Sequence, residues 1–197
     1  MVVSMSDTDF IEFPKIARLS REVIVTEKID GTNACLLIGE AGEFLTGSRT
    51  RWITPQDDNF GFSRWAHEHK EELMTLGVGR HFGEWWGSGI QRGYGLPKGE
   101  KRWSLFNVSR WDEAYRDLVK HPTPRPACCY VVPTLYRGLF DTQVANDVLR
   151  SLASVGSSAA PGFMKPEGIV VFHTAANMGF KKTIEKDDAP KSMEGKA

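Results

Sequence analysis

Four short segments of the sequence carry charged side chains at positions where they could do chemistry. In the first, EKIDG at 27–31, Lys28 ends an apolar, β-branched run, and an Asp-Gly turn follows one residue later. Such a turn can hold the amine in a cleft between strands, where loss of water and nearby cations favour the neutral form that a lysine nucleophile needs. The alternative for Lys28 is a solvated side chain before a hairpin turn.

The other three segments are strand-like runs that carry carboxylates or cations. Glu84 lies inside the apolar run FGEWWG at 82–87, and Glu167 leads the apolar run EGIVVF at 167–172. A buried unpaired carboxylate is costly, so each must face solvent or hold something polar. Glu84 could serve a sugar hydroxyl and Glu167 a divalent cation. In the last run, GFKKT at 179–183, Lys181 and Lys182 could contact a ligand, with salt bridges at the rim as the alternative.

Strands and a few helices are predicted to position these segments. One helix is predicted over 62–76, where the apolar residues share a face, and another over 141–156, behind an Asp141 cap. A third is predicted over 111–119. Apolar and β-branched runs predict strands over 21–27, 32–38, 43–48, 80–86, 102–108, 128–135, 168–173 and 178–183. Because strands dominate and do not alternate regularly with helices, the pattern predicts an α+β fold of antiparallel sheets flanked by helices.

Length and composition indicate one ordinary globular domain. The chain has 197 residues, and Lys+Arg 25 against Asp+Glu 25 gives a net charge of zero. This charge excludes attraction of the whole molecule to nucleic acid, but not a local basic face. Three cysteines, no membrane-length apolar run and no signal peptide predict a reduced, cytoplasmic protein without a membrane partner. The domain is expected over 13–184, between flexible ends at 1–12 and 185–197.

A glycine-rich loop over 87–99 contains five glycines and is too long for a tight hairpin. No helix follows it, so it is not a Walker loop. Its polar and basic residues predict a surface for a nucleic-acid backbone, with a solvated loop as the alternative. The residues of this predicted surface are Gln91, Arg92, Lys98, Lys101 and Arg102. Trp52, beside two arginines, is a candidate for stacking on a base.

Taken in order, the segments resemble the motif series of the covalent nucleotidyltransferases, which include the polynucleotide ligases and the mRNA capping guanylyltransferases. The series is Lys-x-Asp-Gly at 28–31, Ser-Arg at 48–49, Phe-Gly-Glu at 82–84, Leu-Phe-Asn-Val at 105–108, Glu-Gly-Ile-Val-Val at 167–171 and Phe-Lys-Lys at 180–182. Within this group the chain is most similar to the nick-sealing RNA ligase 2 family. The further residues that carry this similarity are EKIDGTN at 27–33, SRT at 48–50 and FGEWWGSGIQ at 82–91. The resemblance runs from about Phe13 to Thr183.

The resemblance implies a role for each of these residues. Lys28 would attack the α-phosphorus of a nucleotide, Arg49 and Glu84 would engage its sugar and the incoming phosphate, and Phe106 would stack on the purine. Glu167 would position a divalent metal, and Lys181 would contact the α-phosphate. The remaining positions around the nucleotide are Glu27, Ile29, Asn33 and Lys182.

As a function, the resemblance implies an ATP-dependent polynucleotide ligase with a nucleotidyltransferase domain over 13–184. The enzyme would use Mg²⁺ or Mn²⁺ and seal 3′-hydroxyl and 5′-phosphate ends, of RNA above all, through a lysyl-AMP intermediate. Two alternatives stay open, a GTP-dependent guanylyltransferase and a nucleic-acid-end binding module that does not turn over. The sequence does not decide between RNA, DNA and hybrid substrates, between nicks and single-strand ends, or between oligomeric states.

Two departures from the family pattern stand out. Asn107 replaces the common Asp after the stacking Phe, and Lys181 and Lys182 are adjacent instead of one residue apart, so which lysine contacts phosphate is open. Only fourteen residues follow Thr183, so no C-terminal OB or other accessory domain is expected, and a partner protein could replace it. Sealing is then expected to be weak, salt-sensitive and better with pre-adenylated ends. Charge removal at Arg92 and Arg102 is expected to lower sealing but not adduct formation.

Overall fold

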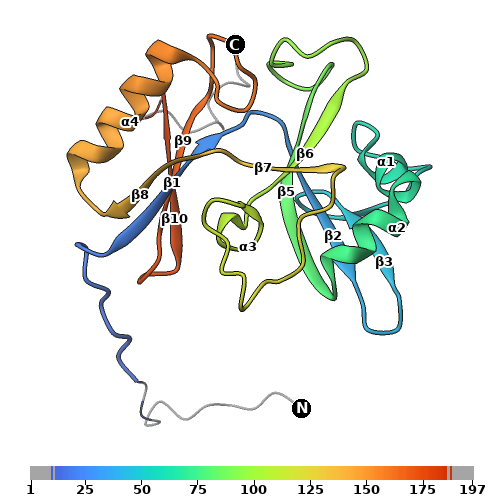
Figure 1. Ribbon diagram of the computed structural model, residues 1–197, viewed down its shortest axis with the longest axis horizontal. Helices are drawn as coiled ribbons and strands as arrows, with labels where there is room; N and C mark the ends of the chain where they lie inside the picture. The colour runs from blue at the N-terminus through green and yellow to red at the C-terminus, as the bar shows by residue number, and fades with distance from the viewer. Residues whose placement is uncertain (1–9, 11, 186, 188–197) are drawn as a thin grey trace.

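Two β-sheets lie side by side, each covered on its outer side by helix (Figure 1). The computed structural model describes residues 10, 12–185 and 187, so the ends predicted to be flexible lie almost entirely outside the described residues. Sheet A has the strand order β10-β9-β1-β8, and sheet B has the order β4-β3-β2-β5-β6-β7. The strands of sheet A are β1 (Glu22–Lys28), β8 (Thr134–Leu139), β9 (Gly168–His173) and β10 (Met178–Thr183). Those of sheet B are β2 (Thr32–Ile38), β3 (Phe44–Gly47), β4 (Trp52–Ile53), β5 (Gly79–Gly87), β6 (Lys101–Leu105) and β7 (Cys129–Val131).

The predicted α+β fold with antiparallel sheets is confirmed, with one exception. Strands β6 and β7 are parallel, and every other pair of neighbouring strands named above is antiparallel. The helices are α1 (Phe62–Glu68), α2 (Lys70–Leu73), a 3₁₀ turn η1 (Met74–Leu76), α3 (Val108–Trp111) and α4 (Thr142–Val155). In the part of the chain that the structure describes, no helix is long and apolar enough to cross a membrane.

The two long predicted helices are confirmed. The first is interrupted at His69, where φ is −105° and ψ is 19°, and therefore continues as α2 and η1. The second is α4, and the Asp141 side chain accepts a hydrogen bond from the Gln143 N–H, as expected for a helix cap. Gly156 ends this helix with φ 92°, a conformation that favours glycine.

The third predicted helix, over 111–119, is wrong. Helix α3 ends at Trp111, where the prediction began. The side chain of Asp112 accepts a hydrogen bond from the Ala114 N–H, and the side chain of Asp117 accepts from the N–H groups of the following turn. Aspartate side chains that bind nearby backbone in this way favour turns over helix.

The predicted strand over 128–135 is also wrong, because it is two strands in different sheets. Strand β7 ends in sheet B, and β8 begins in sheet A after Val132 and Pro133. Proline has no N–H to donate to a ladder, and it stands at the break. The predicted strand over 102–108 ends early, at Leu105, because Asn107 caps α3 by accepting a hydrogen bond from the Arg110 N–H.

Within the described residues, the chain passes between the two sheets twice, over 29–31 and over 132–133. The crossings are tied together, since the Glu27 N–H donates to the Pro133 carbonyl at 2.9 Å. Along β1, Val23 and Val25 are buried in the core cluster that Leu152 of α4 completes. The alternate residues of β1 face sheet B instead.

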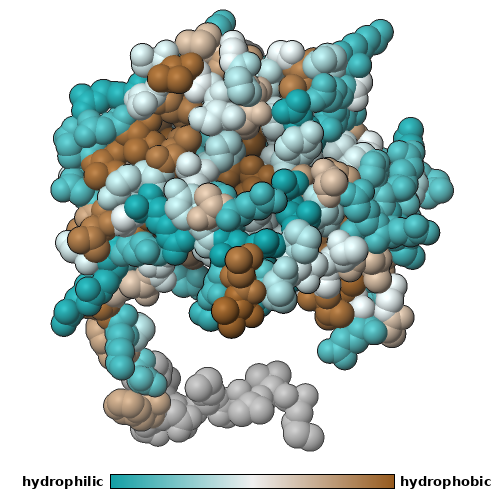
Figure 2. Space-filling model, in the orientation of Figure 1, coloured by the Kyte–Doolittle hydropathy of each residue, from teal (hydrophilic) through white to brown (hydrophobic). Residues whose placement is uncertain are grey.

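Each sheet therefore packs one face against its own helices and turns the other toward its neighbour. Residues of α1 and α2 cover sheet B in a separate core cluster. On the face shown in Figure 2, apolar side chains gather over α4 and β8. There Leu135, Val148 and Leu152 line a shallow groove.

Candidate active site

A cleft of about 880 Å³ lies between the two sheets. Sheet A contributes residues of β1, β9 and β10 to its walls, and sheet B contributes residues of β2 and β5. Residues 106–111, after β6, close a further side. The volume is in the range of clefts that bury a small-molecule ligand.

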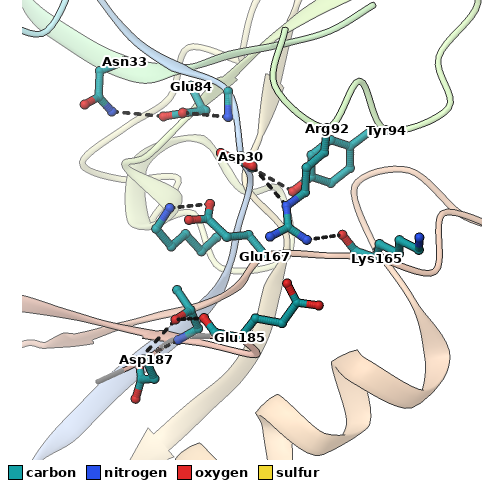
Figure 3. Close-up of polar contacts among 12 residues, drawn as sticks. Asp30, Asn33, Glu84, Arg92, Tyr94, Lys165, Glu167, Glu185 and Asp187 are labelled. Atoms are coloured by element: carbon teal, nitrogen blue, oxygen red, sulfur yellow. Dashed lines mark hydrogen bonds and ion pairs between the residues drawn. The ribbon is translucent and has the colours of Figure 1, made fainter. Parts of the chain in front are cut away.

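Lys28 and Glu167 form an ion pair at this cleft (Figure 3). Lys28 is the last residue of β1 and is paired with Gly168, the first residue of β9, so the residue before Gly168 lies beside it. Their side chains are 21% and 6% exposed, respectively. A Cβ at Gly168 would collide with the Lys182 carbonyl, so glycine is needed where β9 approaches β10. The pairing of β1 with β9 keeps Glu167 next to Lys28.

Glu84 is a second buried carboxylate, on β5 of the opposite sheet. It accepts hydrogen bonds from the Gly31 N–H at 3.1 Å and from Asn33 Nδ2 at 3.0 Å. Burial raises the pKa of Glu84 to about 7, against the lowering effects of Lys28 and of its hydrogen bonds, while the Glu167 charge adds to the increase. The Glu84 carboxyl therefore holds a proton more readily than an ordinary carboxyl.

Three more of the predicted residues line the cleft with Lys28 and Glu84. Arg49 lies in the bend between β3 and β4 and is exposed. Phe106 follows β6 and is 41% exposed, and its N–H donates to the Phe82 carbonyl at 3.0 Å. Lys181 of β10 is paired with Val170 of β9, and both line the cleft. A cleft lined by basic side chains, a buried carboxylate and an exposed aromatic ring can hold an anionic, planar ligand beside the lysine amine.

Lys182 lies outside this cleft. Neighbouring residues of a strand point to opposite faces, so Lys181 faces the cleft and Lys182 faces away. Lys182 Nζ instead pairs with Asp187 at 3.5 Å. The geometry thus favours Lys181 over Lys182 as a contact to a ligand in the cleft.

The carboxylate of Glu27 is held by protein groups. It accepts hydrogen bonds from Ser157 Oγ at 2.6 Å and from the N–H groups of Ser158 at 2.8 Å and Ala159 at 2.9 Å. Burial raises the pKa of Glu27, and these three hydrogen bonds oppose the increase. Glu27, Ile29 and Asn33 all contribute to the lining of the cleft, and Ile29 is buried.

The predicted basic surface of the glycine-rich loop is largely taken up by contacts within the protein. Arg92 pairs with Asp30 at 3.0 Å, and Arg102 pairs with Glu100. Lys101 Nζ donates to the Phe60 carbonyl. Arg92 and Arg102 are thus engaged within the protein, and the expectation that this surface contacts a nucleic-acid backbone stays a prediction.

Other lining residues were not singled out from the sequence. Arg80 lines the cleft, and its guanidinium lies 5.3 Å from the ring centroid of Trp52. Trp52 itself is 46% exposed, so the prediction that it stacks on a base stays a prediction. The sequence signal for Arg80 was the alternation along β5, which gives Arg80, Phe82 and Glu84 the same face.

Comparison with known proteins finds similarity to RNA ligases. A family model described as RNA ligase matches residues 21–187. Among solved structures, an RNA ligase mutant of Naegleria gruberi with ATP and Mn is similar, with a TM-score of 0.60 and 20% identity over 84% of this chain and 50% of that chain. The Naegleria gruberi RNA ligase with PPi gives a TM-score of 0.57 and 19% identity over 83% of this chain and 50% of that one. An apo mutant gives 0.59 and 21%, over 83% and 50%.

These likenesses show the fold, and this chain spans about half the length of the solved chains it matches. Among curated protein sequences, none matches this chain.

Proposed function

The chain belongs to the RNA ligase family, and from that premise we propose that it is an ATP-dependent RNA ligase with a covalent lysyl-AMP intermediate on Lys28. The observation that carries the proposal is the position of Lys28, which is paired with Glu167 at a cleft that also contains Glu84, Phe106 and Lys181. The reaction would join a 3′-hydroxyl to a 5′-phosphate.

In the first step Lys28 Nζ attacks the α-phosphorus of ATP. The Nζ–phosphorus bond forms, the bond from phosphorus to the bridging oxygen breaks, and pyrophosphate leaves with the electron pair. The Lys28 ammonium loses one proton to solvent before the attack, Nζ loses a second as the bond to phosphorus forms, and the third stays as the N–H of the phosphoramidate. Until then, the ion pair with Glu167 holds the amine at a fixed place, and such positioning supplies much of the rate of a phosphoryl transfer.

The other cleft residues act on the nucleotide. Arg49 and Lys181 offset the charge that develops on the phosphate oxygens. Phe106, with an exposed ring, offers a stacking face to the base. Glu84 in its ionised form accepts a hydrogen bond from a sugar hydroxyl, in addition to those from Gly31 and Asn33.

These residues could bind a divalent cation only together with the phosphates of the nucleotide. Among the residues that the structure describes, no group of three or more His, Cys, Asp or Glu side chains could hold a metal ion on its own. Mg²⁺ is commonly bound through one or two carboxylates, water and substrate phosphates, and Glu167 and Glu84 are two such carboxylates. The ion, Mg²⁺ or Mn²⁺, would neutralise phosphate charge. Naegleria gruberi RNA ligase structures with ATP and Mn support this part of the proposal.

In the later steps, AMP moves from Lys28 to a 5′-phosphate, and a 3′-hydroxyl displaces it. The substrates are nucleic-acid ends or nicks, of RNA above all. A cytoplasmic location belongs to the same proposal, supported by the free thiols Cys35, Cys128 and Cys129.

Intact mass after incubation with Mg²⁺ and each nucleoside triphosphate in turn tests the proposal. A gain of one AMP with ATP, lost again when 5′-phosphorylated RNA ends are added, is the expected result. A gain of one GMP with GTP alone would assign a guanylyltransferase instead. No covalent gain with any nucleotide would overturn the proposal.

A further inference from the structure

The glycine-rich loop joins the two segments that carry Lys28 and Glu167, and it does so through Arg92. Arg92 Nε donates to Asp30 Oδ2 at 3.0 Å, two residues after Lys28. Arg92 Nη1 donates to the Lys165 carbonyl at 3.0 Å, two residues before Glu167. Figure 3 shows the guanidinium between these two segments. One side chain thus links the turn after Lys28 to the segment before Glu167.

Tyr94 makes a second link between the same segments. Its hydroxyl accepts a hydrogen bond from the Asp30 N–H at 2.8 Å. Tyr94 is 2% exposed, and its ring packs against that of Phe163 with ring centroids 4.6 Å apart. Phe163 lies four residues before Glu167 in the sequence. The Tyr94 ring also contacts Trp86, with ring centroids 5.1 Å apart. The turn after Lys28 is therefore held by a hydroxyl whose ring is fixed in the core.

The loop adopts a costly backbone shape to make these contacts. Gln91 and Tyr94 have φ angles of 45° and 52°, in the left-handed region that few non-glycine residues occupy. Gly93 and Gly95 take similar angles, 66° and 67°, without that cost. Backbone strain of this kind persists where surrounding contacts require it, and it gathers at functional sites.

We propose that Arg92, together with Tyr94, is a positioning residue for the nucleophile. The two side chains keep the turn after Lys28 and the segment before Glu167 at a fixed separation, so that the Lys28 amine is aligned with the α-phosphorus. This inference rests on the proposed function, in which Lys28 is the nucleophile. It assigns the glycine-rich loop to nucleotide transfer onto Lys28, before any nucleic acid is bound, and replaces the expectation from the sequence that charge removal at Arg92 leaves adduct formation unchanged.

Single-turnover formation of the lysyl adduct, measured over a series of ATP concentrations, tests the inference. Arg92→Ala should lower the rate constant at saturating ATP by roughly tenfold or more, because misplacement of a reacting group by about 1 Å can cost up to about 100-fold. The ATP concentration at half-saturation should change by less than about twofold, since neither residue binds the nucleotide. Tyr94→Phe keeps the ring contacts and should slow the same step. Arg92→Lys, which keeps one charged contact, should recover part of the rate.

Arg137→Ala is the matched control. The Arg137 side chain, like that of Arg92, is 30% exposed and pairs with a carboxylate, Glu22, but it lies on β8 outside the cleft. Its removal should leave the rate constant unchanged. If Arg92→Ala does not fold, Tyr94→Phe and Arg92→Lys decide.

The outcomes separate the two proposals. Wild-type protein without an adduct would overturn the proposed function and this inference with it. A wild-type adduct, together with wild-type rate constants in Arg92→Ala and Tyr94→Phe, would overturn only the positioning role. So would a change confined to the half-saturating ATP concentration.

Discussion

Lys28 and Glu167 are 139 residues apart in the sequence, yet their side chains form an ion pair because the end of β1 lies against the start of β9. The pair joins the end of β1 to the start of β9, the first strand of the β9–β10 hairpin. The pairing of β1 with β9 in sheet A therefore fixes the Glu167 carboxylate beside the Lys28 amine. Substitutions at either residue act on the same site.

Lys28→Arg should abolish the covalent adduct while the protein remains folded. Arginine keeps a cation beside Glu167 but cannot present a neutral nitrogen to phosphorus. Lys28→Ala should abolish the adduct as well. Intact mass after incubation with ATP and Mg²⁺ checks both variants, and the wild-type adduct should be acid-labile and base-stable, as a phosphorus–nitrogen bond is. Adduct on either variant would rule out Lys28 as the nucleophile.

Glu84 should make the protein less stable as pH rises from 4.5 to about 7. Its folded-state pKa of about 7 lies above the ordinary value of 4.5, so in this window the folded state keeps a proton that the unfolded state has lost. The stability that the proton provides is fully present below pH 4.5 and is gone above about pH 7. The shift corresponds to ~3 kcal/mol.

Glu84→Gln removes this titration, so the difference in stability between wild type and variant reports the pH dependence that Glu84 causes. In thermal melts from pH 4 to 8, the melting temperature of the variant should rise relative to that of the wild type by several degrees. The test is how the difference in melting temperature changes with pH. The variant also loses one hydrogen-bond acceptor for Gly31 or Asn33, which shifts its melting temperature by the same amount at every pH. Parallel curves over the whole range would show that Glu84 ionises in the folded protein as it does in the unfolded chain.

Phe106→Ala should raise the KM for ATP in adduct formation by roughly 5- to 100-fold, since stacking on an aromatic ring contributes about 1–3 kcal/mol per base. The ring is 41% exposed, so its loss should hardly change the melting temperature. Phe106→Trp should retain the low KM. Phe180→Ala, which truncates a 54% exposed ring outside the cleft lining, is the control and should keep wild-type KM. Equal KM values in all four proteins would remove Phe106 from the nucleotide site.

Gly31→Ala should destabilise the protein by about 1–3 kcal/mol through overpacking. A Cβ at Gly31 would collide with the Trp85 carbonyl and come within 2.8 Å of the Trp86 Cβ. Gly179→Ala is the comparison, because the nearest atom to its Cβ, on Val170, is 3.8 Å away. Thermal melts should show a clear loss at Gly31 and almost none at Gly179. A similar melting temperature in both variants would mean that the turn at Gly31 shifts at little cost.

The sequence predicted the strands that carry Glu84 and Lys181, and the strand that ends at Lys28 to within one residue, because a run of apolar and β-branched residues is a local pattern. It could not reveal that Arg92 binds Asp30 or that Glu27 binds Ser157, since these partners are 62 and 130 residues apart. The failed helix over 111–119 has a different cause. Aspartate side chains there compete for backbone N–H groups, and hydrophobic periodicity does not record that competition.

The two crossings between the sheets, tied by the hydrogen bond from Glu27 to Pro133, have a mechanical consequence for the cleft. A rotation displaces each point in proportion to its distance from the axis. If the sheets turn relative to each other about the crossings, Lys28, next to that axis, moves least, and side chains farther along the cleft walls move most. The far end of the cleft could then open to admit a ligand while the Lys28 amine keeps its position.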